Sequence, residues 1–283
     1  FSKTYQSMNV EFDRLYYESD TYIGGKEVVE KGVNKGLFYR KEDSSVWVNL
    51  AAWKLDDKLL LRADGTSVYM TQDIGTAIQR HKDFPGLSGL IYTVGNEQEH
   101  HFKVLFAILE TLGFDWAKEC SHLSYGMVDL PSGKMKSREG TVVDADNLVE
   151  EVINLSKKEI KKRHKLDEKE LEERAKKITM SAIIFHILKF DPKKNFVYDP
   201  KESINFEGET GPYCQYAYAR IQSILKKTDV EVEEKLDLLK EEQEKQLVKK
   251  LTEYPLIIEK ISENYKISLI PRYILELSQE FNN

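Results

Sequence analysis

The sequence has few cysteines, no long apolar run and no excess of positive charge. Its two cysteines, Cys120 and Cys214, are too few for a disulfide-stapled scaffold and suit a reducing compartment. No apolar run reaches the roughly 18 residues that suggest a transmembrane helix, so we expect a cytoplasmic protein with no membrane partner. Lys and Arg number 42 against 48 Asp and Glu, and the formal net charge of -6 does not by itself indicate nucleic-acid binding.

The composition that remains is that of a folded chain with a charged surface. Hydrophobic residues make up 41% and charged residues 32% of the 283 residues, enough for one large domain or two ordinary ones. The first half predicts strands at residues 44–50 and 59–62, and a strand at 89–94 buried on both faces of a parallel sheet. Helical spacing follows over residues 99–112 and ends before Gly113.

The second half changes to an almost wholly helical pattern from about Asp146 onward. The predicted helices cover the ranges 148–160, 168–177, 178–190, 212–225 and 230–244. We therefore expect two domains, a mixed α/β domain over residues 1–145 and an all-α domain over residues 146–283.

A basic loop stands near the end of the α/β half. Lys134, Lys136 and Arg138 place three cations within five residues, between Gly133 and Gly140. Such a loop can close on a polyanion and stabilise the charge that develops on a leaving pyrophosphate. An ordinary basic surface loop explains the same residues and, for this stretch alone, is the more common case.

Two further stretches of the first half carry polar groups that suit a small ligand. Asp73 lies four residues after Tyr69 near a predicted helix start; a carboxylate beside a tyrosine suits a guanidinium, although Asp73 could simply cap its helix. Residues 95–101 (GNEQEHH) follow the predicted buried strand, at the edge where open α/β sheets bind ligands. His100 and His101 are neighbours that point apart on a helix, so we expect a polar lining there and no metal site.

An aromatic helix in the second half could contact RNA. Tyr213, Tyr216 and Arg220 recur at helical spacing within residues 211–220, where rings and a guanidinium can stack on unpaired bases. A core stripe with an arginine at its edge is the more frequent meaning of that pattern. The basic stretch 157–165 could meet phosphates, or it could be a solvated charged face.

Four stretches, taken together and in this order, resemble the arginyl-tRNA synthetase family. They read DGTSVYMTQDIG, IYTVGNEQEHH, GKMKSREGTVV and ETGPYCQYAYARIQSIL. The resemblance implies the second half of a class I Rossmann-type catalytic domain, followed by the start of a helical anticodon-binding domain. It covers nearly the whole chain and becomes weaker after about Lys226.

The resemblance also implies roles for individual residues. The basic loop stands where class I synthetases carry KMSKS, which stabilises ATP phosphates; the catalytic residues implied are Lys134, Lys136, Ser137 and Arg138. Those implied for arginine are Glu18, Tyr69, Asp73 and Gln98. Those implied for ATP and its adenosine are Gly95, His100, His101 and Met135, and those for tRNA are Tyr213, Gln215, Tyr216 and Arg220. Two carboxylates around a guanidinium would select arginine over lysine, which lacks the planar fork, and over citrulline, which lacks the charge.

The sequence departs from the class pattern in two places. KMKSR reverses the third and fourth residues of KMSKS, so the catalytic lysine is either Lys134 or Lys136. The His-x-Gly-His signature of the ATP site is absent, because no two of the six histidines have that spacing; they stand at positions 81, 100, 101, 122, 164 and 186. We therefore expect an internal fragment of a longer enzyme that is inactive on its own.

The activity implied for the whole enzyme is that of an arginine-tRNA ligase. ATP, used with Mg²⁺ as a substrate and not as a tightly bound cofactor, activates L-arginine, which is then transferred to the 3' end of its tRNA. The resemblance further implies that tRNA must be bound for the first step. The alternatives are another class I synthetase, such as the cysteinyl or glutamyl type, a non-catalytic RNA-binding protein derived from a synthetase, or a helical interaction module joined to an α/β domain.

Overall fold

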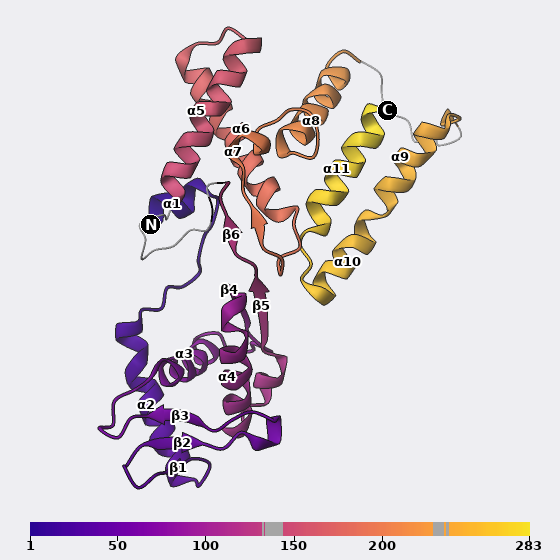
Figure 1. The fold of residues 1–283 in the computed structure, drawn as a ribbon. Coiled ribbons are helices and arrows are strands. Elements are labelled where there is room, and N and C mark those ends of the chain that lie inside the picture. The colour runs from indigo at the N-terminus through magenta and orange to yellow at the C-terminus, as the bar shows by residue number, and fades with distance from the viewer. Residues whose placement is uncertain (132, 134–143, 229–234, 236–237) are drawn as a thin grey trace. The chain divides into compact units, whose positions relative to one another are not determined.

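The computed structural model of the chain describes residues 1–131, 133, 144–228, 235 and 238–283. The chain divides into two compact units, drawn in Figure 1: an α/β unit, Glu11–Tyr125, and a helical unit that combines Phe1–Val10 with Gly126–Asn283. The functional boundary after residue 145 stays a prediction.

The α/β unit contains three longer helices and two small sheets. Its order is α2 (Glu18–Asn34), β1 (Tyr39–Arg40), β2 (Val46–Val48), η1 (Ala51–Trp53), β3 (Lys58–Leu61), α3 (Tyr69–Asp83), β4 (Ile91–Gly95), η2 (Asn96–Gln98), α4 (Glu99–Thr111), η3 (Asp115–Glu119) and β5 (Ser121–Tyr125). Strands β1, β2 and β3 form an antiparallel sheet in that order, and β4 pairs with β5 in parallel. The predicted strand, turn and helix around residues 89–112 is confirmed, and Gly113 follows the helix with a φ of 87°.

The burial predicted for the strand at 89–94 is wrong. Strand β4 runs parallel to β5, from the pair Ile91↔Ser121 to the pair Gly95↔Tyr125, but Ile91 is 50% exposed. Tyr92 points to the other face, where its ring centroid lies 4.8 Å from that of Phe102 in α4. The apolar run therefore has one covered face among the described residues, because α4 packs against one side of a sheet that has two described strands.

Two glycines allow α2 and α3 to cross closely. A Cβ atom at Gly25 would overlap the backbone carbonyl of Thr71, and one at Gly75 would overlap the backbone of Gly25. The Thr71 hydroxyl donates to the carbonyl of Leu60, which ties α3 to β3. The close approach at Gly25 and Gly75 packs α2 and α3 together against the core of the unit. That core includes the fully buried residues Val29, Leu60, Leu61, Ile74, Leu105 and Ile108.

The helical unit is built from α-helices and one short parallel strand pair. Its order is α1 (Ser2–Ser7), β6 (Val128–Asp129), α5 (Ala145–Arg163), α6 (Glu168–Leu188), β7 (Phe196–Val197), α7 (Pro200–Ser203), α8 (Gly211–Leu225), α9 (Glu242–Thr252), α10 (Tyr254–Asn264) and α11 (Leu269–Asn282). Helix α5 packs along α6, and α8 lies between α6 and α11, as Figure 1 shows. The hydroxyl of Thr4 in α1 donates to the carboxylate of Asp146 in α5.

The predicted helices of this unit are confirmed with two changes. The ranges 168–177 and 178–190 form one continuous helix, α6, because no proline or glycine interrupts them. Helix α8 ends at Leu225 as expected and begins one residue before Pro212. About half of the predicted helix at 230–244 lies outside the described residues, and residues 238–241, which are described, are not α-helical. Helix α9 begins only at Glu242.

Candidate functional site

Two of the predicted ligand-binding residues meet in the α/β unit. Asp73 of α3 and His101 of α4 lie 2.6 Å apart, measured from Oδ2 to Nε2. Their side chains are 43% and 22% exposed, so the pair is open to a ligand. Helix α3 already begins at Tyr69, which places Asp73 one turn inside the helix and excludes the alternative that it only caps the helix start.

The carboxyl end of β4 supplies the other polar groups of this region. Gly95 ends the strand and is followed by η2. Gln98 directly precedes α4, three residues before His101, and is exposed, as is His100. The ligand-lining role of these residues stays a prediction.

Glu18 and Tyr69, the other residues implied for arginine, each begin a helix of this unit. Both are exposed, Tyr69 by 79%. Among the described residues no hydrogen bond or ion pair joins either of them to Asp73. The structure thus brings Asp73 and His101 into contact. The side chains of Glu18 and Tyr69 are exposed and, among the described residues, are not bonded to Asp73.

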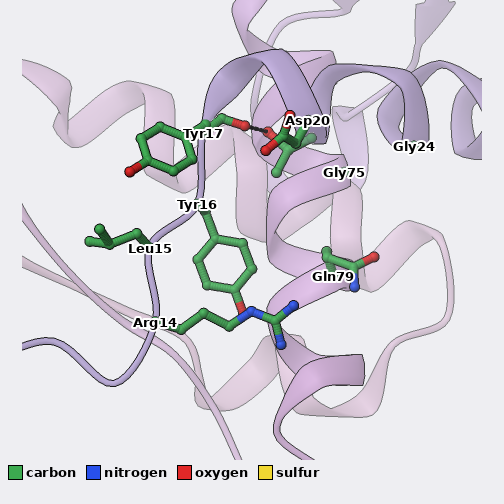
Figure 2. A pocket seen from close by; sticks show the side chains of 9 residues that line it. Arg14, Leu15, Tyr16, Tyr17, Asp20, Gly24, Gly75 and Gln79 are labelled. Atoms are coloured by element: carbon green, nitrogen blue, oxygen red, sulfur yellow. Dashed lines mark hydrogen bonds between the residues drawn. The ribbon is translucent and has the colours of Figure 1, made fainter.

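A cavity of about 240 Å³ lies beside the start of α2 (Figure 2). The residues that line it are Arg14, Leu15, Tyr16, Tyr17, Asp20, Thr21, Gly24, Gly75 and Gln79. Glu18 is not among them, although Tyr17 and Asp20 on either side of it are. Figure 2 shows the ring of Tyr16 beside the guanidinium of Arg14, and the side chain of Gln79 from α3 lies near both.

One carboxylate fixes the segment that enters this cavity. Asp83, at the end of α3, accepts from the Tyr16 hydroxyl at 2.9 Å and from the Gln79 amide at 2.8 Å, and pairs with Arg14 at 3.1 Å. Burial and the hydrogen bond to Asp83 raise the pKa of Tyr16. Sequence reasoning missed all four residues, because their relation depends on the close crossing of α2 and α3 and not on local spacing.

Behind β4 the unit is apolar and packed. Burial raises the pKa of Tyr92 to about 12, and the guanidinium of Arg80 lies 5.7 Å from the centroid of its ring. The ring of His122 in β5 lies tilted against that of Phe102, at 4.6 Å between ring centroids, and its Nε2 lies 3.0 Å from the carbonyl oxygen of Val94. These groups support the end of β4 from one side, so the polar edge at Gln98 stands on a rigid base.

The basic loop itself cannot be placed. Lys134, Met135, Lys136, Ser137 and Arg138, which carry the phosphate-binding prediction, lie outside the described residues. The described residues just before them form β6, which pairs in parallel with β7 through Val128↔Phe196 and Asp129↔Val197.

The residues predicted to contact tRNA separate into two groups on α8. Tyr213 and Tyr216 line a cavity of about 470 Å³, and Tyr216 is 56% exposed. Arg220 is turned to α11, where it donates to the side-chain carbonyl of Asn282 at 3.0 Å. Gln215 donates to the backbone carbonyl of Lys177 at 3.2 Å. Tyr213 and Tyr216 are thus the two that share a cavity.

The same cavity contains cations that the sequence did not single out individually. Arg163, at the end of α5, lies over the ring of Phe206 at 4.6 Å, and Arg174 of α6 lines the cavity beside them. Much of the basic stretch is neutralised by neighbours: Lys157 pairs with Glu172, and Lys162 pairs with Glu159 at 2.5 Å. The interpretation of a solvated charged face therefore fits those lysines.

The described residues contain neither a cluster of metal ligands nor a membrane-spanning helix. No group of three or more His, Cys, Asp or Glu there could hold a metal ion. Nor is any described helix both long and apolar enough to cross a membrane.

Two solved structures show which fold the chain has. It is similar to the arginyl-tRNA synthetase of Thermus thermophilus with a TM-score of 0.85, over 99% of this chain and 53% of that one, at 23% identity. It is also similar to the methionyl-tRNA synthetase of Mycobacterium tuberculosis, solved with methionyl-adenylate, with a TM-score of 0.67 over 100% of this chain and 67% of that one, at 11% identity. Likeness to synthetases of two specificities at such low identity shows the fold alone, which is that of a class I aminoacyl-tRNA synthetase.

The sequence comparisons identify the family. A family described as class I (R) tRNA synthetases, catalytic domain, matches residues 1–200, and the DALR anticodon binding domain matches residues 214–283. The chain belongs to the arginyl-tRNA synthetase family.

Curated relatives agree with this assignment. The arginine–tRNA ligase of Flavobacterium psychrophilum is 52% identical over 286 residues, and that of Bacteroides thetaiotaomicron is 49% identical over 290 residues. Each match covers 100% of this chain and 48% of the relative. The chain thus spans about half the length of these curated relatives.

Proposed function

We propose that the gene product containing this chain is an arginine-tRNA ligase of the cytoplasm. Arginine reacts with ATP to give arginyl-adenylate and pyrophosphate, and the arginine is then transferred to the terminal adenosine of its tRNA. The observation that carries the proposal is a half-exposed carboxylate, Asp73 of α3, held against His101 of α4 in a chain of this family. A substrate with a guanidinium needs such a carboxylate, because guanidinium binds carboxylate oxygens through its planar fork of N–H groups.

The arginine side of the site is assigned to four residues. Asp73 accepts from the guanidinium, Gln98 lies at the same edge of the sheet, and Glu18 and Tyr69 contribute from the exposed starts of α2 and α3. A second carboxylate raises selectivity, because lysine and citrulline would leave charged or hydrogen-bonding groups without partners.

The ATP side is assigned to the end of β4 and to the basic loop. Gly95, His100, His101 and Met135 are assigned to the adenosine side, and Lys134 or Lys136, with Ser137 and Arg138, is assigned to stabilising the phosphates. Mg²⁺ enters bound to ATP, as part of the substrate, and offsets the same negative charge.

The helical unit is proposed to bind tRNA. Its support is the match of residues 214–283 to an anticodon-binding domain and the cavity lined by Tyr213, Tyr216 and Arg163. Aromatic rings offer stacking surfaces to unpaired bases, and cations offer charge to phosphates.

Aminoacylation of bulk tRNA by the complete gene product tests the proposal. Labelled arginine, lysine and cysteine are offered separately, with the 283-residue chain assayed in parallel. Charging with arginine alone supports the proposed specificity. Charging with another amino acid would move the chain to another class I specificity. No charging, with tRNA binding intact, would favour a non-catalytic RNA-binding protein.

A further inference from the structure

We propose that His101 is a positioning residue for arginine: it holds one oxygen of the Asp73 carboxylate so that the other faces the guanidinium. The proposal rests on the proposed function, because it concerns the same ligand. It assigns to His101 a task in arginine binding besides its predicted place beside adenosine.

The geometry of the pair determines which atom carries the proton. The Nε2 of His101 lies 2.6 Å from Oδ2 of Asp73, and an ionised carboxylate only accepts hydrogen bonds. Nε2 therefore donates to Oδ2. The imidazole is held in turn by Phe102, whose ring it meets edge-on at 5.6 Å and which is itself buried in the core. The donor is thus mounted on a rigid part of α4.

The hydrogen bond from His101 restricts the motion of the Asp73 carboxylate. With 43% of its side chain exposed, Asp73 would otherwise move among several rotamers on the surface of α3. A hydrogen bond to a different helix selects one of them. Among the described residues Asp73 has no other hydrogen-bond or ion-pair partner, so Oδ1 and the second lone pair of Oδ2 stay available to N–H donors.

Histidine suits this position better than lysine or arginine. A single imidazole N–H orients Asp73, whereas a lysine or arginine at position 101 would pair with the carboxylate as a permanent cation and compete with the guanidinium. Elsewhere in the unit carboxylates do carry such partners: Glu30 pairs with Arg40 at 2.5 Å and Asp83 with Arg14 at 3.1 Å.

The test compares variants of His101 in the complete gene product by equilibrium dialysis against labelled arginine. His101→Phe keeps a ring and removes the donor, and we expect about ten-fold weaker arginine binding, the size of a hydrogen bond to a charged group. His101→Gln keeps an N–H donor and should recover most of the affinity. Lys103→Gln, on an exposed face of the same helix, is the control and should bind as the wild type does.

Kinetics and a double substitution separate positioning from a general structural effect. In ATP–pyrophosphate exchange with tRNA present, His101→Phe should raise the KM for arginine about ten-fold with a smaller change in kcat and in the KM for ATP. In an Asp73→Asn background the same substitution should add little, because the two residues act as one unit. A thermal melt of each variant checks that it is folded.

Each outcome decides a different statement. If Asp73→Asn weakens arginine binding but His101→Phe does not, or if Gln recovers nothing, the role of His101 is refuted and the proposed function stands. If the two substitutions are additive, His101 does not act through Asp73. If the wild-type gene product binds no arginine, the proposal falls together with the proposed function.

Discussion

Acid should destabilise the helical unit through one buried histidine, His186 of α6. The residue is 2% exposed, and neither of its ring nitrogens has a hydrogen-bond partner among the described residues. Its ring lies among those of Phe190, Phe196 and Tyr198, at centroid distances of 5.5, 6.4 and 5.1 Å. Burial, and after it the charge of Lys189, lowers the pKa of His186.

The sign of the effect follows from the proton balance. A lowered pKa in the folded chain means that the unfolded chain binds more protons at any pH between the folded value and about 6.5, the ordinary value for histidine. The free energy of unfolding therefore falls as the pH drops below about 6.5, by at most about 1.4 kcal/mol per pH unit, until the folded pKa is reached. Above pH 7 this residue contributes no pH dependence. The backbone of Val197, and after it the charges of Glu202 and Asp199, oppose the shift and make the slope smaller than this limit.

Urea denaturation of the chain at several pH values between 7.5 and 5 measures the slope. All three tryptophans, Trp47, Trp53 and Trp116, lie in the α/β unit, so the helical signal in circular dichroism must be followed and not their fluorescence. His186→Phe fits the aromatic surroundings and should remove this part of the pH dependence. His164→Gln, at an exposed position of the same unit, should leave it unchanged. Equal slopes for the wild type and His186→Phe would refute the reasoning.

Three further predictions concern the two units. Gly75→Val should lower the free energy of unfolding by about 1–3 kcal/mol, measured in urea, because its side chain would overlap α2, whereas Gly24→Ala meets no atom within 4 Å and should not destabilise. Asp73→Asn should weaken arginine binding about ten- to a hundred-fold by dialysis, since a hydrogen bond to a charged group contributes about 1.5–3 kcal/mol; unchanged affinity would remove Asp73 from the site. Arg163→Ala should weaken tRNA binding several-fold and reduce its salt dependence by about one charge, whereas Lys162→Ala, already paired with Glu159, should change it less.

Local features of the fold were predictable from the sequence because they depend on neighbouring residues. The strand at 91–95, the helix after it and the stop at Gly113 follow from an apolar run, a polar turn and a glycine. The error at β4 has a non-local cause: an apolar run does not say how many strands and helices will cover it. The same limit explains α6, where a change in polarity within one helix was taken as a boundary between two.

The candidate site shows the same division between local and distant information. Asp73 and His101 could both be singled out from their own stretches, but they are 28 residues apart and nothing in the sequence pairs them. Only the packing of α3 against α4 shows that they form a pair. The charge of the basic stretch 157–165 is likewise balanced from a distant part of the sequence, because Lys157 on α5 meets Glu172 on α6.

The state of each carboxylate is what separates the Asp73 site from the cavity beside α2. That cavity has tyrosines and an aspartate nearby, which would suit a cationic ligand by composition alone. Its Asp83, however, already accepts from Tyr16 and Gln79 and pairs with Arg14, and its side chain is only 12% exposed. A guanidinium arriving at Asp83 would have to displace the guanidinium of Arg14. Asp73 carries the same chemical group with one imidazole donor and an open side, so a substrate cation can replace its hydration shell without displacing a lysine or an arginine.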